Sequence, residues 1–167
     1  MLNVGLRPHE SYELVWADVG LDEMTVTARP RKKKADKPRI VEITSATRSK
    51  LAAHRRLQKK ERLRMGTLWP ADYRELVFVN ENGRPLDGPN MRRLLNRWTE
   101  TAEINKRITP YDLRHTVASL AADAGVNIVT LADYLGNDQE TLLRYYRKPV
   151  TPVMSLGIDL AEEAEGR

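Results

Sequence analysis

The chain has 167 residues, a net charge of +5 and an isoelectric point near 9.6, and 41% of its residues are hydrophobic. This size and composition predict one globular domain with a sizeable core. Cysteine is absent, which excludes disulfides and thiolate metal sites, and no secretory leader or membrane-length apolar run is evident. We therefore expect a soluble, intracellular protein.

The first half of the chain is predicted to form a helix, a β-hairpin and a second, long helix. Residues 8–19 are predicted to be helical, because a proline suits the first turn and apolar residues follow at helical spacing. Apolar and polar residues alternate in 24–28 and 39–43, which predicts two paired strands joined by a lysine-rich loop at 30–38. Residues 45–65 are predicted to form the long, very basic helix.

The second half is predicted to be mostly helical. A short strand at 76–79 is closed by an Asn-Gly turn, and helices follow at 89–102, 111–124, 127–136 and 138–148. Apolar residues at helical spacing in the first two of these helices are expected to face the core: Met91, Leu94, Leu95, Trp98, Leu113, Val117, Leu120 and Ala121. The predicted fold class is α+β, mostly helical, with a small antiparallel β-sheet on one side.

Positive charge is concentrated in one block of the sequence. Residues 29–64 hold fifteen lysines or arginines against three acidic residues, whereas the chain from Asp159 onward is acidic. A basic block beside a mixed remainder favours a polyanionic partner. The alternative is a solvated helix face together with a disordered loop.

Two arginines stand in positions that suit phosphate binding. Arg7 precedes a proline at a predicted helix start, where its planar fork of donors and the free N–H groups of the helix could face one anion. Arg114 lies inside an apolar helix, where a buried charge needs an anion or a carboxylate partner. The alternative interpretation of Arg114 is an internal salt bridge to an acidic residue. The adjacent His115 is ambiguous, because a histidine there could simply make a hydrogen bond in the core.

A tyrosine pair closes the last predicted helix. A tyrosine hydroxyl has an ordinary pKa near 10 and becomes a useful nucleophile when cations hold the phosphate it attacks. Tyr145 and Tyr146 point about 100° apart on a helix, so only one of them can face a given site. The lysines of the hairpin loop (Lys32, Lys33, Lys34 and Lys37) could protonate a departing oxygen or simply be solvated.

Three segments in order resemble the motifs of the catalytic domain of tyrosine recombinases, the phage integrase family. GLRPHESYELVWADV resembles the first motif and TPYDLRHTVASLAADAGV the second. YLGNDQETLLRYYRKP resembles the end of the second motif and the segment of the nucleophile. A lysine-rich hairpin lies between the first two, and the resemblance covers roughly residues 4–149. It implies the integrase-type catalytic fold.

The resemblance implies catalytic roles at matching positions. Arg7 and Arg114 would clamp the scissile phosphate and stabilise its pentacoordinate transition state. Tyr146, nine residues after Asn137 as is usual in the family, would be the nucleophile that forms a 3′-phosphotyrosyl link and releases a 5′-hydroxyl. No metal and no other cofactor would be needed.

The hairpin lysine is assigned in the same way. Lys34 lies five residues before Arg39, which matches the lysine that protonates the leaving oxygen, and Lys33 is the alternative. His115 follows the second arginine, as is common in the family.

The sequence departs from the family pattern at two catalytic positions. Tyr111 stands three residues before Arg114, where the family usually has histidine, and Asn137 follows Leu-Gly, where histidine or tryptophan is usual. A tyrosine hydroxyl can still donate to a phosphate oxygen or pass a proton. An asparagine amide can donate to a phosphate but does not shuttle protons near neutral pH.

The resemblance also predicts how the chain is organised. Residues 1–149 would be the catalytic domain, with the usual N-terminal core-binding domain absent because only six residues precede Arg7. Residues 150–167 would be a C-terminal tail that could contact a neighbouring subunit. We expect double-stranded DNA as the partner, a tetramer of the full-length chain on DNA, a cytoplasmic, nucleoid-associated location, and no membrane or small-molecule partner.

The predicted function is therefore site-specific DNA recombination, in which strands are cut and rejoined through the phosphotyrosyl intermediate. One alternative is a catalytically impaired remnant of the fold that only binds DNA, which Tyr111 and Asn137 favour. Another is an interaction protein whose basic surface meets an acidic partner. A type IB topoisomerase, which uses a similar site, is the enzymatic alternative.

Overall fold

The computed structural model describes residues 4–30 and 37–146, and the side chains of four residues in the last helix (141 and 144–146) are outside that description. The elements, in chain order, are α1 (Pro8–Tyr12), β1 (Val19–Gly20), β2 (Thr25–Ala28), β3 (Arg39–Glu42), α2 (Ser45–Met65), α3 (Gly88–Thr101), α4 (Pro110–Asp123), α5 (Ile128–Leu135) and α6 (Gln139–Tyr146). Three short 3₁₀ turns, Trp16–Asp18, Gly66–Leu68 and Ala71–Tyr73, complete them. The expected α+β class is confirmed.

The three strands form one antiparallel sheet in the order β1-β2-β3. Val26 lies opposite Val41, and Ala28 opposite Arg39, in the β2–β3 pairing. Val26, Ala28 and Val41 are buried, so one face of the sheet is covered. The predicted hairpin is therefore confirmed for its strands, whereas its loop, including Lys33 and Lys34, lies outside the described residues.

The predicted helix at 8–19 is wrong beyond Tyr12. The backbone after Tyr12 extends and pairs with a distant segment: the Val77 amide donates to the Leu14 carbonyl at 2.8 Å, and the Trp16 amide to the Glu75 carbonyl at 2.8 Å. This pairing replaces the helical bonds of the same groups. It also accounts for the predicted strand at 76–79, which forms only isolated bridges to Val15 and Pro85.

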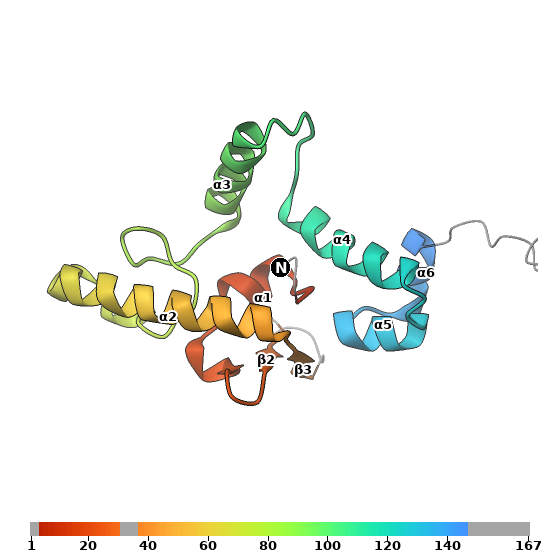
Figure 1. The fold of residues 1–167 in the computed structure, drawn as a ribbon, viewed down its shortest axis with the longest axis horizontal. Coiled ribbons are helices and arrows are strands. Elements are labelled where there is room, and N and C mark those ends of the chain that lie inside the picture. The colour runs from red at the N-terminus through yellow and green to blue at the C-terminus, as the bar shows by residue number, and fades with distance from the viewer. Residues whose placement is uncertain (1–3, 31–36, 147–167) are drawn as a thin grey trace, which may run out of the picture.

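The buried side-chain amide of Gln58 holds helix α2 against the rest of the protein, and α2 lacks a broad apolar face. Gln58 accepts a 2.7 Å hydrogen bond from Trp16 Nε1 and donates to the carbonyls of Leu76 and Val77 at 2.9 and 3.1 Å. Both the oxygen and the nitrogen of that side chain are thereby satisfied, which makes its burial tolerable. Figure 1 shows α2 crossing the molecule, with its second half away from the sheet.

Two hydrophobic clusters organise the molecule. The N-terminal cluster consists of Val4, Leu6, Leu14, Trp16, Val19, Val26, Ala28, Val41, Ile43 and Val77. The C-terminal cluster consists of Ala118, Leu131, Ala132, Leu135 and Leu142, from α4, α5 and α6. Tyr134 packs against both. The end of α5 therefore lies where the two clusters meet.

The inward face of α4 agrees with the expected one only in part. Leu113, Val117 and Ala121 are half-buried, and Ala121 packs against the C-terminal cluster, whereas Leu120 is 64% exposed. The fully buried residues of this helix are Arg114 and Ala118, which the apolar pattern did not indicate. In α3, Leu95 is buried as expected, but Trp98 is 57% exposed.

No described helix is long and apolar enough to be a membrane span.

Candidate active site

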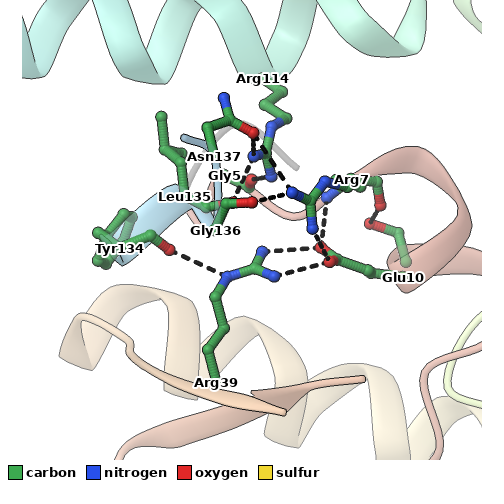
Figure 2. Close-up of polar contacts among 10 residues, drawn as sticks. Gly5, Arg7, Glu10, Arg39, Arg114, Tyr134, Leu135, Gly136 and Asn137 are labelled. Atoms are coloured by element: carbon green, nitrogen blue, oxygen red, sulfur yellow. Dashed lines mark hydrogen bonds and ion pairs between the residues drawn. The ribbon is translucent and has the colours of Figure 1, made fainter. Parts of the chain in front are cut away.

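Three arginines from distant segments meet at the C-terminal end of α5 (Figure 2). They form the arginine cluster: Arg7 just before α1, Arg39 at the start of β3, and Arg114 in the second turn of α4. Three successive carbonyls each accept a hydrogen bond from a different member: Tyr134 from Arg39, Leu135 from Arg114, and Gly136 from Arg7. The last carbonyls of a helix lack intrahelical partners and carry the negative end of its dipole, so guanidinium groups suit them.

Asn137 joins the two arginines that the sequence assigned to one phosphate. Its Oδ1 accepts a 2.9 Å hydrogen bond from Arg114 Nη2 and a 3.4 Å hydrogen bond from Arg7 Nη2. The structure thus brings Arg7 and Arg114 together, as expected. Because Oδ1 faces two cationic donors, the amide is oriented with its NH₂ group turned away from them, where it can donate to a further acceptor.

Two glycines allow this close approach. Gly5 has φ +61°, its carbonyl accepts from Arg114 Nη1 at 2.5 Å, and a Cβ there would lie 2.7 Å from a methyl carbon of Leu135. Gly136 has φ +63°, and a Cβ there would lie 3.1 Å from Arg39 Nη1. Both positions therefore require the backbone freedom and the small size of glycine, which explains the glycines of the GLR and Leu-Gly segments.

Glu10 is the carboxylate of the site and is held by two of the arginines. Arg39 makes a bidentate pair with it at 2.6 and 2.8 Å, and Arg7 approaches it through Nη1 at 3.1 Å and through its backbone amide at 2.7 Å. Burial alone would raise the pKa of Glu10, but hydrogen bonds from Arg39 and the Arg7 amide and both guanidinium charges outweigh it and hold that pKa at about 2. Glu10 is therefore ionised at neutral pH.

Sequence reasoning used Arg39 as the first residue of a strand and as the reference for the spacing of Lys34, and gave it no role in the site. A signal for its inward position was present, since alternate residues of a strand share a face. Arg39 therefore shares a face with Val41 and Ile43, both of which are buried. An arginine in line with two buried apolar residues indicates a cation with an internal partner.

The arginine cluster carries a surplus of positive charge. Among the described residues, its three guanidinium groups face one carboxylate, and none of the ion pairs found there joins Arg114 to an acid. Burial, together with the charges of Arg7 and Arg39, lowers the pKa of Arg114 to about 10, so this group stays charged at neutral pH. A phosphodiester would supply the missing negative charge.

The other predicted site residues are placed less centrally or lie outside the description. Tyr111 is 55% exposed in the first turn of α4, and within the described part of the chain it makes no hydrogen bond to the arginine cluster. Tyr146 ends α6, but its side chain and that of Tyr145 are not described. Lys34 is among the undescribed residues. Across the described ranges, no group of three or more His, Asp or Glu residues could hold a metal ion.

Comparisons with known proteins agree with this architecture. The model of the phage integrase family matches residues 1–151. An integrase from Streptomyces ambofaciens is 32% identical over 90% of this chain, and a tyrosine recombinase XerD from Halalkalibacterium halodurans is 29% identical over 85% of it. The chain spans 37% and 44% of the length of these two relatives.

Solved structures share the fold. The crystal structure of XerA recombinase covers 99% of this chain with a TM-score of 0.74 and 24% identity, and the match spans 56% of that protein. The XerH site-specific recombinase bound to its difH substrate covers 93% of this chain with a TM-score of 0.70 and 20% identity, over 43% of its own length. The fold, a set of helices with a small sheet on one side, is therefore one seen in experimental structures.

Proposed function

Because the chain belongs to the phage integrase family, we propose that it is the catalytic part of a site-specific DNA recombinase. It cuts and rejoins DNA strands through a 3′-phosphotyrosyl intermediate. One observation carries the proposal: the guanidinium groups of Arg7 and Arg114 meet at Asn137 Oδ1, in a cluster with surplus positive charge. That is the arrangement needed to hold one phosphate from two sides.

Each proposed step uses a group of this chain. Arg7 and Arg114 bind the two non-bridging oxygens of the scissile phosphate, and the outward NH₂ of Asn137 donates to one of them. The Tyr146 oxygen attacks phosphorus as its own proton leaves to solvent, the bond between phosphorus and the 5′ oxygen breaks, and Lys34 donates a proton to that departing oxygen. Rejoining is the reverse reaction, in which a 5′-hydroxyl attacks the phosphotyrosine. Tyr111, at the edge of the site, donates a hydrogen bond to the phosphate or passes a proton.

The same function implies an assembly on DNA. Residues 1–149 form the catalytic domain, and the tail at 150–167 contacts a neighbouring subunit of a tetramer on double-stranded DNA. The difH-bound state of the XerH recombinase supports DNA as the partner. Where it acts on chromosomal DNA, the protein is associated with the nucleoid.

Helix α2 is a second proposed contact with the DNA backbone. Lys59 and Lys60 are exposed on it, whereas Arg48 is engaged by the Leu21 carbonyl at 2.7 Å and Arg55 lies 5.1 Å from the Trp16 ring centre. The exposed lysine charges would release counterions on binding. Replacing Lys59 and Lys60 by glutamine should weaken DNA binding at low salt and lower the slope of log affinity against log salt by roughly two.

Covalent trapping tests the function. The full chain is incubated with a nicked duplex that carries its cognate site, first selected from a randomised pool, and a denaturing gel reveals any protein–DNA adduct. We expect an adduct for the wild type and for Tyr145→Phe, but none for Tyr146→Phe. An adduct that persists in Tyr146→Phe would show that another residue is the nucleophile. DNA binding without an adduct in any variant would instead identify a binding remnant of the fold.

A further inference from the structure

Arg39 connects three parts of the site through one side chain. It starts β3, makes the bidentate pair with Glu10 of α1, and donates from Nε to the Tyr134 carbonyl at the end of α5 at 3.0 Å. Its side chain is 15% exposed and that of Glu10 is fully buried. All three nitrogens of the guanidinium fork are therefore used inside the protein, so Arg39 is not placed to bind DNA itself.

The same contacts show how Arg39 acts on Arg7. Glu10 Oε1 accepts from both Arg39 Nη1 and Arg7 Nη1, so the carboxylate is shared between the two guanidinium groups. The other terminal nitrogen of Arg7 points to Gly136 and Asn137. The orientation of Arg7 thus depends on a carboxylate whose own position is fixed by Arg39.

We propose that Arg39 is a positioning residue, which keeps Glu10 from capturing Arg7 and so leaves Arg7 available to the scissile phosphate. This inference rests on the proposed function for its catalytic readout. Without Arg39, the Glu10 carboxylate would form its own bidentate pair with Arg7, the favoured geometry for these groups. The surplus charge of the cluster would also fall from two to one. Lysine cannot replace Arg39, because one ammonium group cannot reproduce the planar fork.

Arg29 provides a matched control on the same hairpin. It makes a bidentate pair with the buried Asp18 at 2.7 and 2.6 Å. The pair resembles Arg39–Glu10 in chemistry, but within the described residues no hydrogen bond or ion pair joins it to the arginine cluster. We therefore expect Arg29→Met to remove an arginine–carboxylate pair from the hairpin and to leave the position of Arg7 unchanged.

The experiment compares cleavage by the wild type, Arg39→Met, Arg39→Lys and Arg29→Met at saturating nicked duplex, with DNA affinity and thermal midpoint measured in parallel. We expect Arg39→Met to slow single-turnover cleavage by about 100-fold, and Arg39→Lys to recover little of it, while DNA affinity changes by less than about 5-fold. Arg29→Met should cleave within about 3-fold of the wild type. Equal loss in Arg39→Met and Arg29→Met would reduce Arg39 to a structural role.

A double variant separates positioning from simple destabilisation. If Arg39 restrains Glu10, then Glu10→Gln in the Arg39→Met background should recover about tenfold in cleavage, because a neutral amide no longer captures Arg7 yet can still cap α1. A double variant no faster than Arg39→Met overturns the proposal.

A readout without DNA keeps the inference testable if the wild type forms no adduct and the proposed function fails. Inorganic phosphate, a single-anion probe, should bind Arg39→Met about tenfold more weakly than the wild type, with part of the loss recovered by Glu10→Gln in that background. Equal phosphate affinity in the wild type and Arg39→Met would reject the positioning role independently of catalysis.

Discussion

Asn137 is a neutral group between two cations, and we expect this neutrality to matter for the proposed reaction. Its Oδ1 accepts from Arg7 and Arg114 without cancelling either charge. A carboxylate at the same position would make the same hydrogen bonds and two ion pairs as well. An aspartate should therefore stabilise the protein in the absence of phosphate and weaken the binding of phosphate. Stability and activity should move in opposite directions on this substitution.

Asn137→Asp should accordingly raise the thermal midpoint by about 2–4 °C, because each 1 kcal/mol of added stability has roughly that effect in a protein of this size. The same substitution should slow cleavage at least about 100-fold, since the carboxylate occupies the clamp and repels the substrate. Differential scanning fluorimetry and single-turnover cleavage measure the two effects.

Asn127→Asp is the control for this substitution. Asn127 caps α5 by accepting from the Val129 amide at 2.8 Å, and aspartate caps about as well as asparagine. The charge change is then the same, but it is not at the arginine cluster, so cleavage and stability should both stay near wild type. Lower stability together with normal cleavage in Asn137→Asp would contradict the geometry described for Asn137.

Glu10 gives the stability of the protein a specific pH dependence. Its pKa is lowered from 4.5 to about 2 in the folded state. Folding therefore favours the ionised form, and the stabilisation is complete above about pH 4.5 and is lost as the pH falls toward 2. The shift corresponds to on the order of 3 kcal/mol.

Urea unfolding between pH 5 and pH 3 tests this dependence. The wild type should lose stability steeply over this range, and Glu10→Gln should show a shallower slope, because glutamine does not titrate. The absolute stability of the variant is not the test, since Glu10→Gln also removes ion pairs. Parallel curves for the two proteins would show that another group governs the acid sensitivity.

At the scale of elements, the C-terminal end of α5 determines where the arginines meet. Gly136 ends the helix in the left-handed conformation, and this turn directs three successive carbonyls toward three different arginines. A side chain at Gly136 would both strain the backbone and press on the Arg39 guanidinium. A second glycine, Gly125, follows α4 at φ +78°, and a Cβ added there would meet no described atom within 4 Å.

The two glycines therefore form a matched pair. Gly125→Ala should cost about 1 kcal/mol of unfolding free energy from backbone strain alone. Gly136→Ala should cost more than Gly125→Ala and should also slow cleavage by more than about tenfold, because it displaces Arg39 and the α5 carbonyls. Chemical denaturation and cleavage rates measure both. Identical behaviour of the two variants would mean that contact with Arg39 is unimportant.

Elements with local end signals could be predicted from the sequence, and elements set by distant pairing could not. The helix at 45–65 is correct at both ends, because Thr44 caps its start and Gly66 its end. Thr109 and Asp112 form the capping box that starts α4. The chain after Tyr12 was predicted incorrectly because its backbone pairs with a segment about 60 residues away, around Leu76.

The same division applies to the site. Arg7, Arg114 and Asn137 lie in motifs of fixed spacing, so the sequence identifies them. The link between Arg39 and Glu10 depends on which face of β3 packs against α1, and that register is a property of the folded sheet. The inward turn of Arg114 likewise depends on acceptors from Gly5 and Leu135, which no helical periodicity in α4 reveals.

At the scale of the whole molecule, the arginine cluster lies between the N-terminal and the C-terminal hydrophobic clusters. Tyr134 packs against both, and Arg39, Glu10 and Arg7 join the sheet and α1 to the end of α5. The surplus positive charge therefore lies at the boundary between two cores, where like charges oppose their association. An anion bound there should stabilise the boundary and hence the whole fold.

We therefore expect about 10 mM inorganic phosphate to raise the thermal midpoint by a few degrees over chloride at equal ionic strength and pH. For a dissociation constant of about 1 mM, mass action gives roughly 1.4 kcal/mol at this concentration. At such low concentrations the general stabilising effect of phosphate on protein surfaces is small, so the shift reports binding.

Two variants locate the phosphate effect. Arg7→Met removes a partly exposed arm of the clamp and should abolish most of the shift, whereas replacing Lys59 and Lys60 on α2 by glutamine should leave it intact, because those lysines are exposed on α2 and bind no described member of the arginine cluster. If Arg7→Met responds to phosphate like the wild type, the anion acts elsewhere on the surface. The boundary between the two hydrophobic clusters would then not be the place where ligand binding and folding are coupled.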